Sequence, residues 1–116
     1  MRDLALQISG MLAVLAGALH GAIGEMRVFP RARIEPAWAK LLLRLVWQCS
    51  AIAWIGVGAL LIATPSLASE PARHWIAFVS AAIYGFAALS NAVATRGRHF
   101  GWMVLSAVVA LALAGA

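Results

Sequence analysis

The sequence is poor in charged residues, which make up 11% of its 116 residues, and only four of them are acidic. In an ordinary soluble domain, about a quarter of the residues are charged. Hydrophobic residues make up 64% of the chain, so there are too few polar side chains to cover a water-soluble globule of this size. The sequence therefore predicts an integral membrane protein whose main solvent is lipid.

The chain also lacks the residues on which many functional sites depend. Its single cysteine, Cys49, excludes an internal disulfide and a cysteine-based zinc site, and we expect it to lie in a helix core as a small apolar residue. No Gly-rich phosphate loop, nucleophile elbow or paired-carboxylate signature is present. We therefore predict no cofactor and no bound metal, and we lean toward a non-enzymatic protein.

Four long apolar stretches are present instead, over residues 4–24, 37–63, 73–95 and 99–115. Each is near or above the ~17 to 25 residues that cross a bilayer as a helix. We therefore predict an all-α fold, with residues 1–116 forming a single transmembrane domain: an integral membrane four-helix bundle of up-down topology. The first stretch continues to about Ile23, which favours a retained helix over a cleavable signal peptide.

The connections contain residues that end or begin helices. We expect Thr64-Pro65 to end the second helix, Ser69 to cap the third, and Arg96-Gly97-Arg98 to form a tight turn. Seven of the nine basic residues lie in or beside the first and third connections, which should therefore be cytoplasmic. Loops 25–40 and 96–98 are thus predicted to face the cytoplasm, and both termini the opposite side. The net charge of +5 reports this orientation, and nucleic acid is not a predicted partner.

Glycines recur along the first predicted helix. Gly17, Gly21 and Gly24 share one face with His20, and Gly10 lies one turn or more before them. Small residues let membrane helices approach closely. We therefore predict a helix-packing seam of Gly10, Gly17, Gly21 and Gly24.

One set of polar residues could carry chemistry. His20 is the one ionisable residue well inside a predicted span, and Gln48, Asn91 and Ser106 are expected at a similar depth on the other three helices. Glu25 and Arg44 are natural ion-pair partners at the cytoplasmic mouth. The predicted cluster opens to the cytoplasm and comprises His20, Glu25, Arg44, Gln48, Tyr84, Asn91 and Ser106. Polar residues between membrane helices also serve as structural hydrogen bonds, and this second interpretation stays open.

The sequence fits two functional classes poorly: haem proteins with two histidine ligands and small multidrug exporters. A haem held by two histidines needs both at one depth, whereas His74 and His99 fall near opposite boundaries and His20 lies inside. Small four-helix multidrug exporters are of similar length but rely on a membrane-embedded glutamate in the first helix. The four acidic residues here all lie at helix ends or in connections.

The segment Leu19-His20-Gly21-Ala22-Ile23-Gly24-Glu25, with Leu43-Arg44-Leu45-Val46-Trp47-Gln48, resembles an uncharacterised group of small bacterial four-helix inner-membrane proteins. That group has a pattern similar to His-Ser-x-x-Gly-Glu in helix one and Arg-x-x-Trp-His in helix two. This chain has Gly21 in place of the serine and Gln48 in place of the second histidine. The resemblance implies a multi-pass protein of the bacterial inner membrane and no known activity.

Two functions follow from these patterns. The first is an accessory or interaction subunit that packs in a membrane assembly, as a homo-oligomer or within a larger membrane complex, with the lipid bilayer around it. The alternative is small-molecule binding or transport through the cytoplasm-facing polar cluster.

Overall fold

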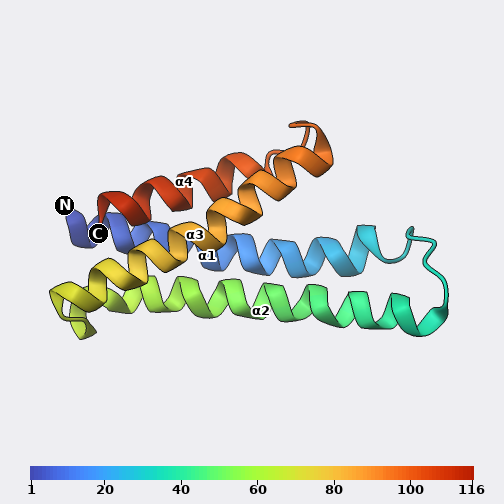
Figure 1. Ribbon diagram of the computed structural model, residues 1–116, viewed down its shortest axis with the longest axis horizontal. Coiled ribbons are helices and arrows are strands. Elements are labelled where there is room, and N and C mark those ends of the chain that lie inside the picture. The colour runs from blue at the N-terminus through green and yellow to red at the C-terminus, as the bar shows by residue number, and fades with distance from the viewer.

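The computed structural model describes residues 1–116 and is entirely helical, without strands. Its elements are α1 (Arg2–Ile23), the π-helical turn η1 (Gly24–Val28), α2 (Ala37–Leu67), α3 (Glu70–Thr95) and α4 (Gly101–Ala114). The elongated molecule measures 48 × 26 × 18 Å, and its two termini lie at the same end (Figure 1). The predicted all-α fold with four helices is confirmed.

Three of the helices are long and apolar enough to cross a membrane: α1 with η1, α2 and α3. The fourth is shorter than predicted. The helix α4 has 14 residues, about 21 Å of helix against a hydrocarbon core of about 30 Å. Its predicted start at residue 99 is wrong because His99 belongs to the turn, where its Nδ1 accepts a hydrogen bond from the Gly101 N–H at 3.1 Å.

The end of α2 also differs from the prediction. Thr64-Pro65 does not stop the helix, which continues to Leu67. Proline lacks an N–H donor and its ring crowds the carbonyl four residues back, but the hydrogen bonds beyond it still form: the N–H of Ala68 reaches the carbonyl of Thr64 at 3.0 Å. The chain turns at Ala68, whose backbone is extended. Ser69 then precedes α3, as predicted, although its side chain makes no capping hydrogen bond.

The turn between α3 and α4 is tight, as predicted. Arg96 and Gly97 both have positive φ angles, 52° and 72°. The N–H of Gly97 donates to the carbonyl of Ala92 at 2.7 Å, which is the hydrogen bond of a left-handed helix cap.

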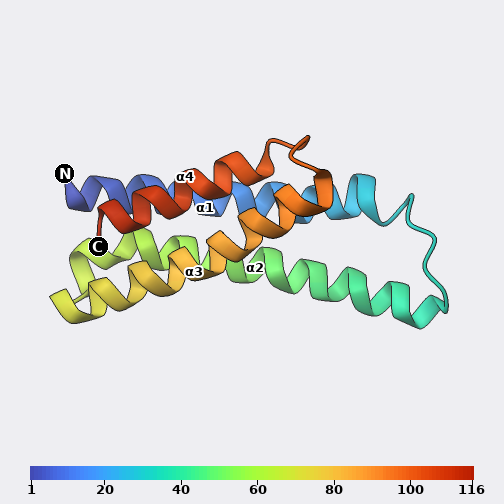
Figure 2. The same cartoon turned by 45° about the horizontal axis from the view of Figure 1, so that its top comes forward.

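The helix α1 lies at the centre of the arrangement. It packs along α2 on one side and against α4 on another, while α3 packs mainly on α4 (Figures 1 and 2). The α1–α2 pair extends beyond the turn that joins α3 to α4 (Figure 1). The loop end of this hairpin therefore extends past the other two helices, and the candidate site lies near it.

Glycine permits backbone contact between α1 and α2. A Cβ atom added at Gly10 would lie 2.5 Å from the carbonyl oxygen of Gly58, and one added at Gly58 would lie 2.8 Å from that of Gly10. The other three seam glycines also face α2: Gly17 lies against Ala51 and Ile55, Gly21 against Gln48, and Gly24 against the Trp47 indole. The seam is thus occupied within the chain.

Ion pairs join the helix ends where the termini lie. The buried Arg73 contacts Asp3 at 2.7 Å and donates to the carbonyl of Gly115 at 2.8 Å. Arg2 contacts Glu70 at 3.0 Å. Arg2 and Arg73 are the two basic residues outside the first and third connections, and no partner was predicted for either, although Asp3 and Glu70 lie near the same helix ends.

Candidate polar site between α1 and α2

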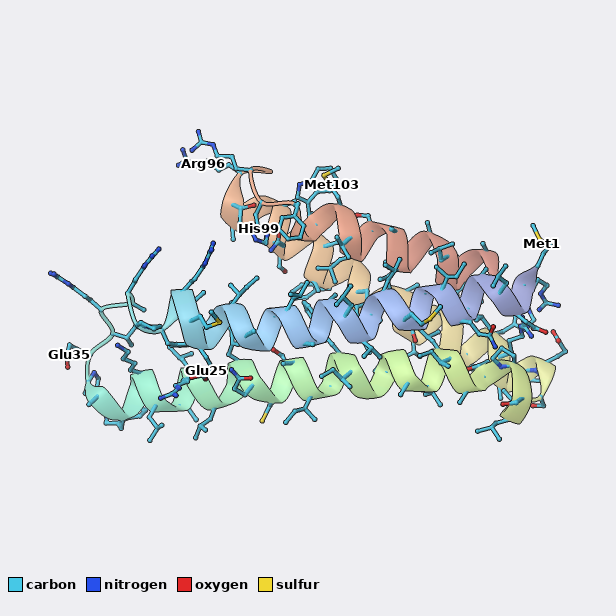
Figure 3. The ribbon with its side chains drawn as sticks, turned by 180° about the vertical axis from the view of Figure 1, so that it is seen from behind. Met1, Glu25, Glu35, Arg96, His99 and Met103 are labelled. Carbon is cyan, nitrogen blue, oxygen red and sulfur yellow. The ribbon has the colours of Figure 1, made fainter.

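The site begins where α1 changes its winding. The N–H of Phe29 donates to the carbonyl of Gly24, five residues back, at 3.0 Å, so this last turn is π-helical. Such wider turns are rare and occur often near functional sites. This turn presents Glu25 toward α2 on the face seen in Figure 3.

Glu25 is held by two side chains of α2. The Nε of Arg44 donates to both carboxylate oxygens, at 3.0 and 2.9 Å, and its Nη2 donates to Oε2. The Nε2 of Gln48 donates to Glu25 Oε1 at 2.9 Å and to the carbonyl of Gly21 at 3.0 Å. The predicted ion pair is therefore present, and Gln48 connects it to the backbone of α1.

His20 points to the other side of the hairpin, where it lies between two indole rings. Its ring stacks on Trp47 with centroids 4.2 Å apart and on Trp54 with centroids 4.5 Å apart. Its Nε2 lies 2.9 Å from the Ser50 hydroxyl. The indole N–H of Trp47 donates to the His20 carbonyl at 2.8 Å.

The hydrogen-bond pattern fixes which nitrogen of neutral His20 carries the proton. The Ser50 hydroxyl donates its one hydrogen to the carbonyl of Trp47 at 2.6 Å, so toward His20 it can only accept. This assignment of the hydroxyl hydrogen places the proton of neutral His20 on Nε2 and leaves the free lone pair on Nδ1. Neutral His20 thus acts here as a hydrogen-bond donor between helices.

Sequence reasoning missed the residues that surround His20. Trp47, Ser50 and Trp54 follow one another at i, i+3 and i+7 and so share one face of α2. That spacing was visible in the sequence. His20 and Glu25 contact different sides of α2. The seven predicted residues therefore do not form one cluster.

The other three predicted residues lie elsewhere. The Tyr84 hydroxyl donates to the carbonyl of Trp54 at 2.6 Å, which ties α3 to the aromatic group around His20. The Oδ1 of Asn91 is buried without a hydrogen-bond partner beside the α3–α4 turn. Ser106 is exposed on α4 and does not face the other predicted residues. Cys49, which was expected in a helix core, is exposed on α2.

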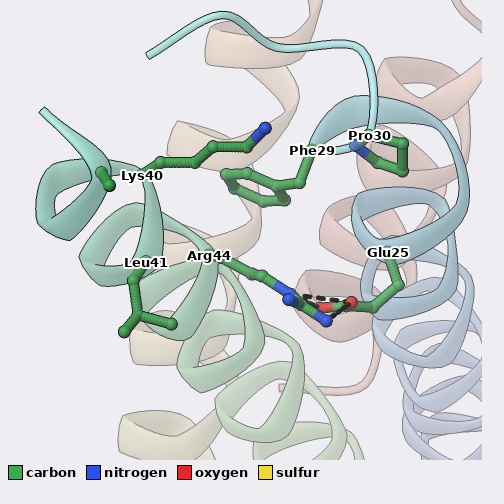
Figure 4. A pocket seen from close by; sticks show the side chains of 7 residues that line it. Glu25, Phe29, Pro30, Lys40, Leu41 and Arg44 are labelled. Atoms are coloured by element: carbon green, nitrogen blue, oxygen red, sulfur yellow. Dashed lines mark hydrogen bonds and ion pairs between the residues drawn. The ribbon is translucent and has the colours of Figure 1, made fainter. Parts of the chain in front are cut away.

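Two cavities meet at Glu25. The first has a volume of about 350 Å³ and lies between η1 and the start of α2, with Lys40 and Arg44 among its lining residues (Figure 4). The second, of about 340 Å³, runs along the α1–α2 contact from Glu25 and Gln48 to Ile55. No group of three or more His, Cys, Asp or Glu side chains is placed to hold a metal ion.

The site thus combines a charged mouth with an apolar groove. Most of its polar atoms form hydrogen bonds between α1 and α2. This arrangement suits a structural link between two helices better than it suits proton transfer. No protein-family model matches the chain, and comparisons with curated proteins and with solved structures found no match. The resemblance to small bacterial inner-membrane proteins therefore stays a prediction.

Proposed function

We propose that this chain is a non-enzymatic integral membrane protein that acts as an accessory subunit, packing through the outer face of α2 against a second copy or a larger membrane complex. In this proposal the helices are inserted in the bacterial inner membrane with up-down topology. The termini are non-cytoplasmic, and loops 25–40 and 96–98 are cytoplasmic.

A row of small residues on the outer face of α2 supports the proposal. Cys49, Ala53 and Gly56 recur at i, i+4 and i+7, and Ala63 continues the row at i+14. The first three are exposed, and a Cβ added at Gly56 would meet nothing within 4 Å. Small residues let a second helix approach closely, whereas lipid gains nothing from them. We call Cys49, Ala53, Gly56 and Ala63 the outer α2 row.

The helix α2 is also the least covered of the three long helices. Only 17% of its most apolar stretch is buried, against 39% for α1. The residues opposite the outer α2 row, such as Ala51, Ile55 and Gly58, face α1. The outer α2 row therefore points directly away from the rest of the chain, where only a partner or lipid can cover it.

Transport through the polar cluster has less support. Glu25, Arg44 and Gln48 hydrogen-bond one another, and the His20 ring is enclosed by two indoles and Ser50. These contacts explain the polar residues as links between two membrane helices.

The proposal is tested by native mass spectrometry of the chain extracted gently from its own membrane. We expect the wild type to carry a second copy or other chains. Gly56→Leu should lose them while staying folded, because the side chain enters open space. Ala107→Leu, at an exposed position on α4, is the matched control and should keep them.

Disulfide cross-linking through the native Cys49 can show whether the partner is a second copy of this chain. Cys49 lies on the outer α2 row, so mild oxidation in membranes should link two copies if the partner is a second chain of the same kind. The control is Cys49→Ala combined with Ser106→Cys, which moves the thiol to an exposed site on α4. A solitary wild-type chain, or partners retained in full by Gly56→Leu, would refute the proposed function.

A further inference from the structure

Three polar side chains of α2 line the site from its open end, which we call the mouth and which lies between η1 and the start of α2, toward the middle of the hairpin. Lys40, Arg44 and Gln48 follow one another at i, i+4 and i+8, so they lie on one face of the helix. Lys40 and Arg44 line the first cavity, and Gln48 lines the second. Figure 4 shows Lys40 extending beside Phe29, and Arg44 reaching across to Glu25.

The charges at this mouth are not balanced. Glu25 compensates Arg44, whereas Lys40 has no ion-pair partner among the three ion pairs of the structure. The Lys40 ammonium makes one hydrogen bond, to the carbonyl of Ala32 at 3.0 Å, and an ammonium has three donors. Arg27 of η1 and Arg31 and Arg33 of the adjoining connection add three more positive charges, against one further acidic residue, Glu35, and none of the four is in an ion pair. An anion is therefore the complementary ligand.

Beyond Glu25 and Gln48, the second cavity has an apolar lining. It is lined on α1 by small residues, Gly17, Ala18, Gly21 and Ala22, and on α2 by Ala51, Ile52 and Ile55. Ala18, Ala22 and Ile52 are exposed, so the groove is open along the side of the hairpin. Arg44 and Ile55 are separated by about 16 Å along α2. That is close to the ~15 Å of hydrocarbon in one bilayer leaflet, and hence to the reach of one acyl chain.

We infer that this side of the hairpin is a binding site for an anionic phospholipid. The phosphate lies beside Lys40 and Arg44, and one acyl chain follows the groove from Gln48 to Ile55. A free phosphate ion would use the mouth but not the groove, whereas a lipid uses both. The groove lies beside the outer α2 row, and the inference rests on the membrane insertion stated in the proposed function but not on the accessory-subunit role.

The test uses the full chain in nanodiscs that contain equal amounts of phosphatidylglycerol and phosphatidylcholine. Native mass spectrometry of the released protein should show one phosphatidylglycerol retained in preference to phosphatidylcholine. Lys40→Gln should lower the retained fraction about fivefold, the effect of one basic residue near an anionic lipid surface. Arg98→Gln, which removes a charge from the other cytoplasmic turn, is the matched control and should leave retention unchanged.

A second pair of variants tests the groove separately. Ala22→Leu adds bulk at an exposed position of the groove and should lower lipid retention, while Ala107→Leu on α4 should not. Circular dichroism establishes that each variant is folded. Equal retention of the two lipids by the wild type, or full retention by both Lys40→Gln and Ala22→Leu, would overturn the inference.

Inorganic phosphate distinguishes a lipid from a soluble anion. If excess phosphate displaces the bound lipid while Ala22→Leu has no effect, the mouth binds a soluble anion and the lipid site is refuted. Bound lipid that resists phosphate and is lost in Ala22→Leu supports the inference. Because retention is measured on the single chain, a negative result here leaves the subunit test unaffected.

Discussion

Replacement of Gly10 by alanine should separate the two helices that make the closest contact in the molecule. The added Cβ would lie 2.5 Å from the Gly58 carbonyl oxygen and 2.9 Å from the Ile62 N–H nitrogen. Comfortable contacts between heavy atoms begin near 3.5 Å, so α1 and α2 must move apart by about 1 Å. The Ile62 Cγ1 atom, at 2.6 Å, can move with its side chain, but the Gly58 oxygen and the Ile62 nitrogen are backbone atoms, which cannot rotate out of the way.

The size of the effect follows from two opposing terms. Adding a methyl group to a well-packed contact destabilises a protein by about 1 to 3 kcal/mol. At Gly10 we expect a value near the upper limit, because the opposing backbone of α2 is rigid. Alanine has a higher helix propensity than glycine, which stabilises the variant by about 1 kcal/mol. The net expectation is a loss of about 2 kcal/mol in the free energy of unfolding, from the difference of those terms.

Gly56→Ala is the matched control, since it makes the same chemical change on α2 in open space. Only the propensity term applies there, so we expect a gain of up to about 1 kcal/mol. Unfolding is followed by far-ultraviolet circular dichroism as sodium dodecyl sulfate is titrated into mixed micelles. Equal unfolding curves for the two variants would refute the backbone contact between α1 and α2.

Two further predictions concern polar contacts. Asp3→Asn leaves the buried Arg73 without its counter-charge and should cost about 1 to 2 kcal/mol, a value reduced because Asp3 is exposed. Glu70→Gln breaks only an exposed, solvent-screened pair and should therefore shift the unfolding curve less than Asp3→Asn in the same titration. His20→Phe keeps an aromatic ring between the two indoles but loses the bond to Ser50, so it should cost about 1 kcal/mol with the near-ultraviolet signal retained. Loss of that signal would contradict the stacked arrangement.

The helices and their turns could be read largely from the sequence. Long apolar stretches separated by proline, glycine and charge locate four helices, because those residues affect the backbone locally. The pairing of Glu25 with Arg44 was also predictable, since a charge at a helix end in a membrane protein needs a nearby partner. The failure at Pro65 has a local cause too, because near a helix end a lost N–H costs only one hydrogen bond.

The direction in which side chains face was less predictable. Ser106 was placed by depth alone, but α4 is apolar on nearly all sides, and its sequence does not indicate which side packs on α1 and α3. The enclosure of His20 by Trp47 and Trp54 depends on the rotation of α1 relative to α2, which one helix's periodicity does not set. Cys49 was expected in a core because it is a small apolar residue, and that property does not show which face of α2 it occupies. Its face of α2 is outward because α1 takes the opposite one.

The distribution of contacts along α1 and α2 explains why the polar site lies where it does. Near the termini, where α4 also packs on α1, the two helices meet through the backbone at Gly10 and Gly58. Farther along, Tyr84 of α3 reaches the carbonyl of Trp54, and the loop end of the hairpin extends past the α3–α4 turn (Figure 1). There the contacts become directional: an ion pair, an amide bridge and an indole hydrogen bond. Hydrogen bonds between membrane helices add to the packing of the pair, by about 1 kcal/mol each. The polar residues therefore stabilise the part of the hairpin that has one side exposed, and that side carries both the groove proposed to bind lipid and the outer α2 row.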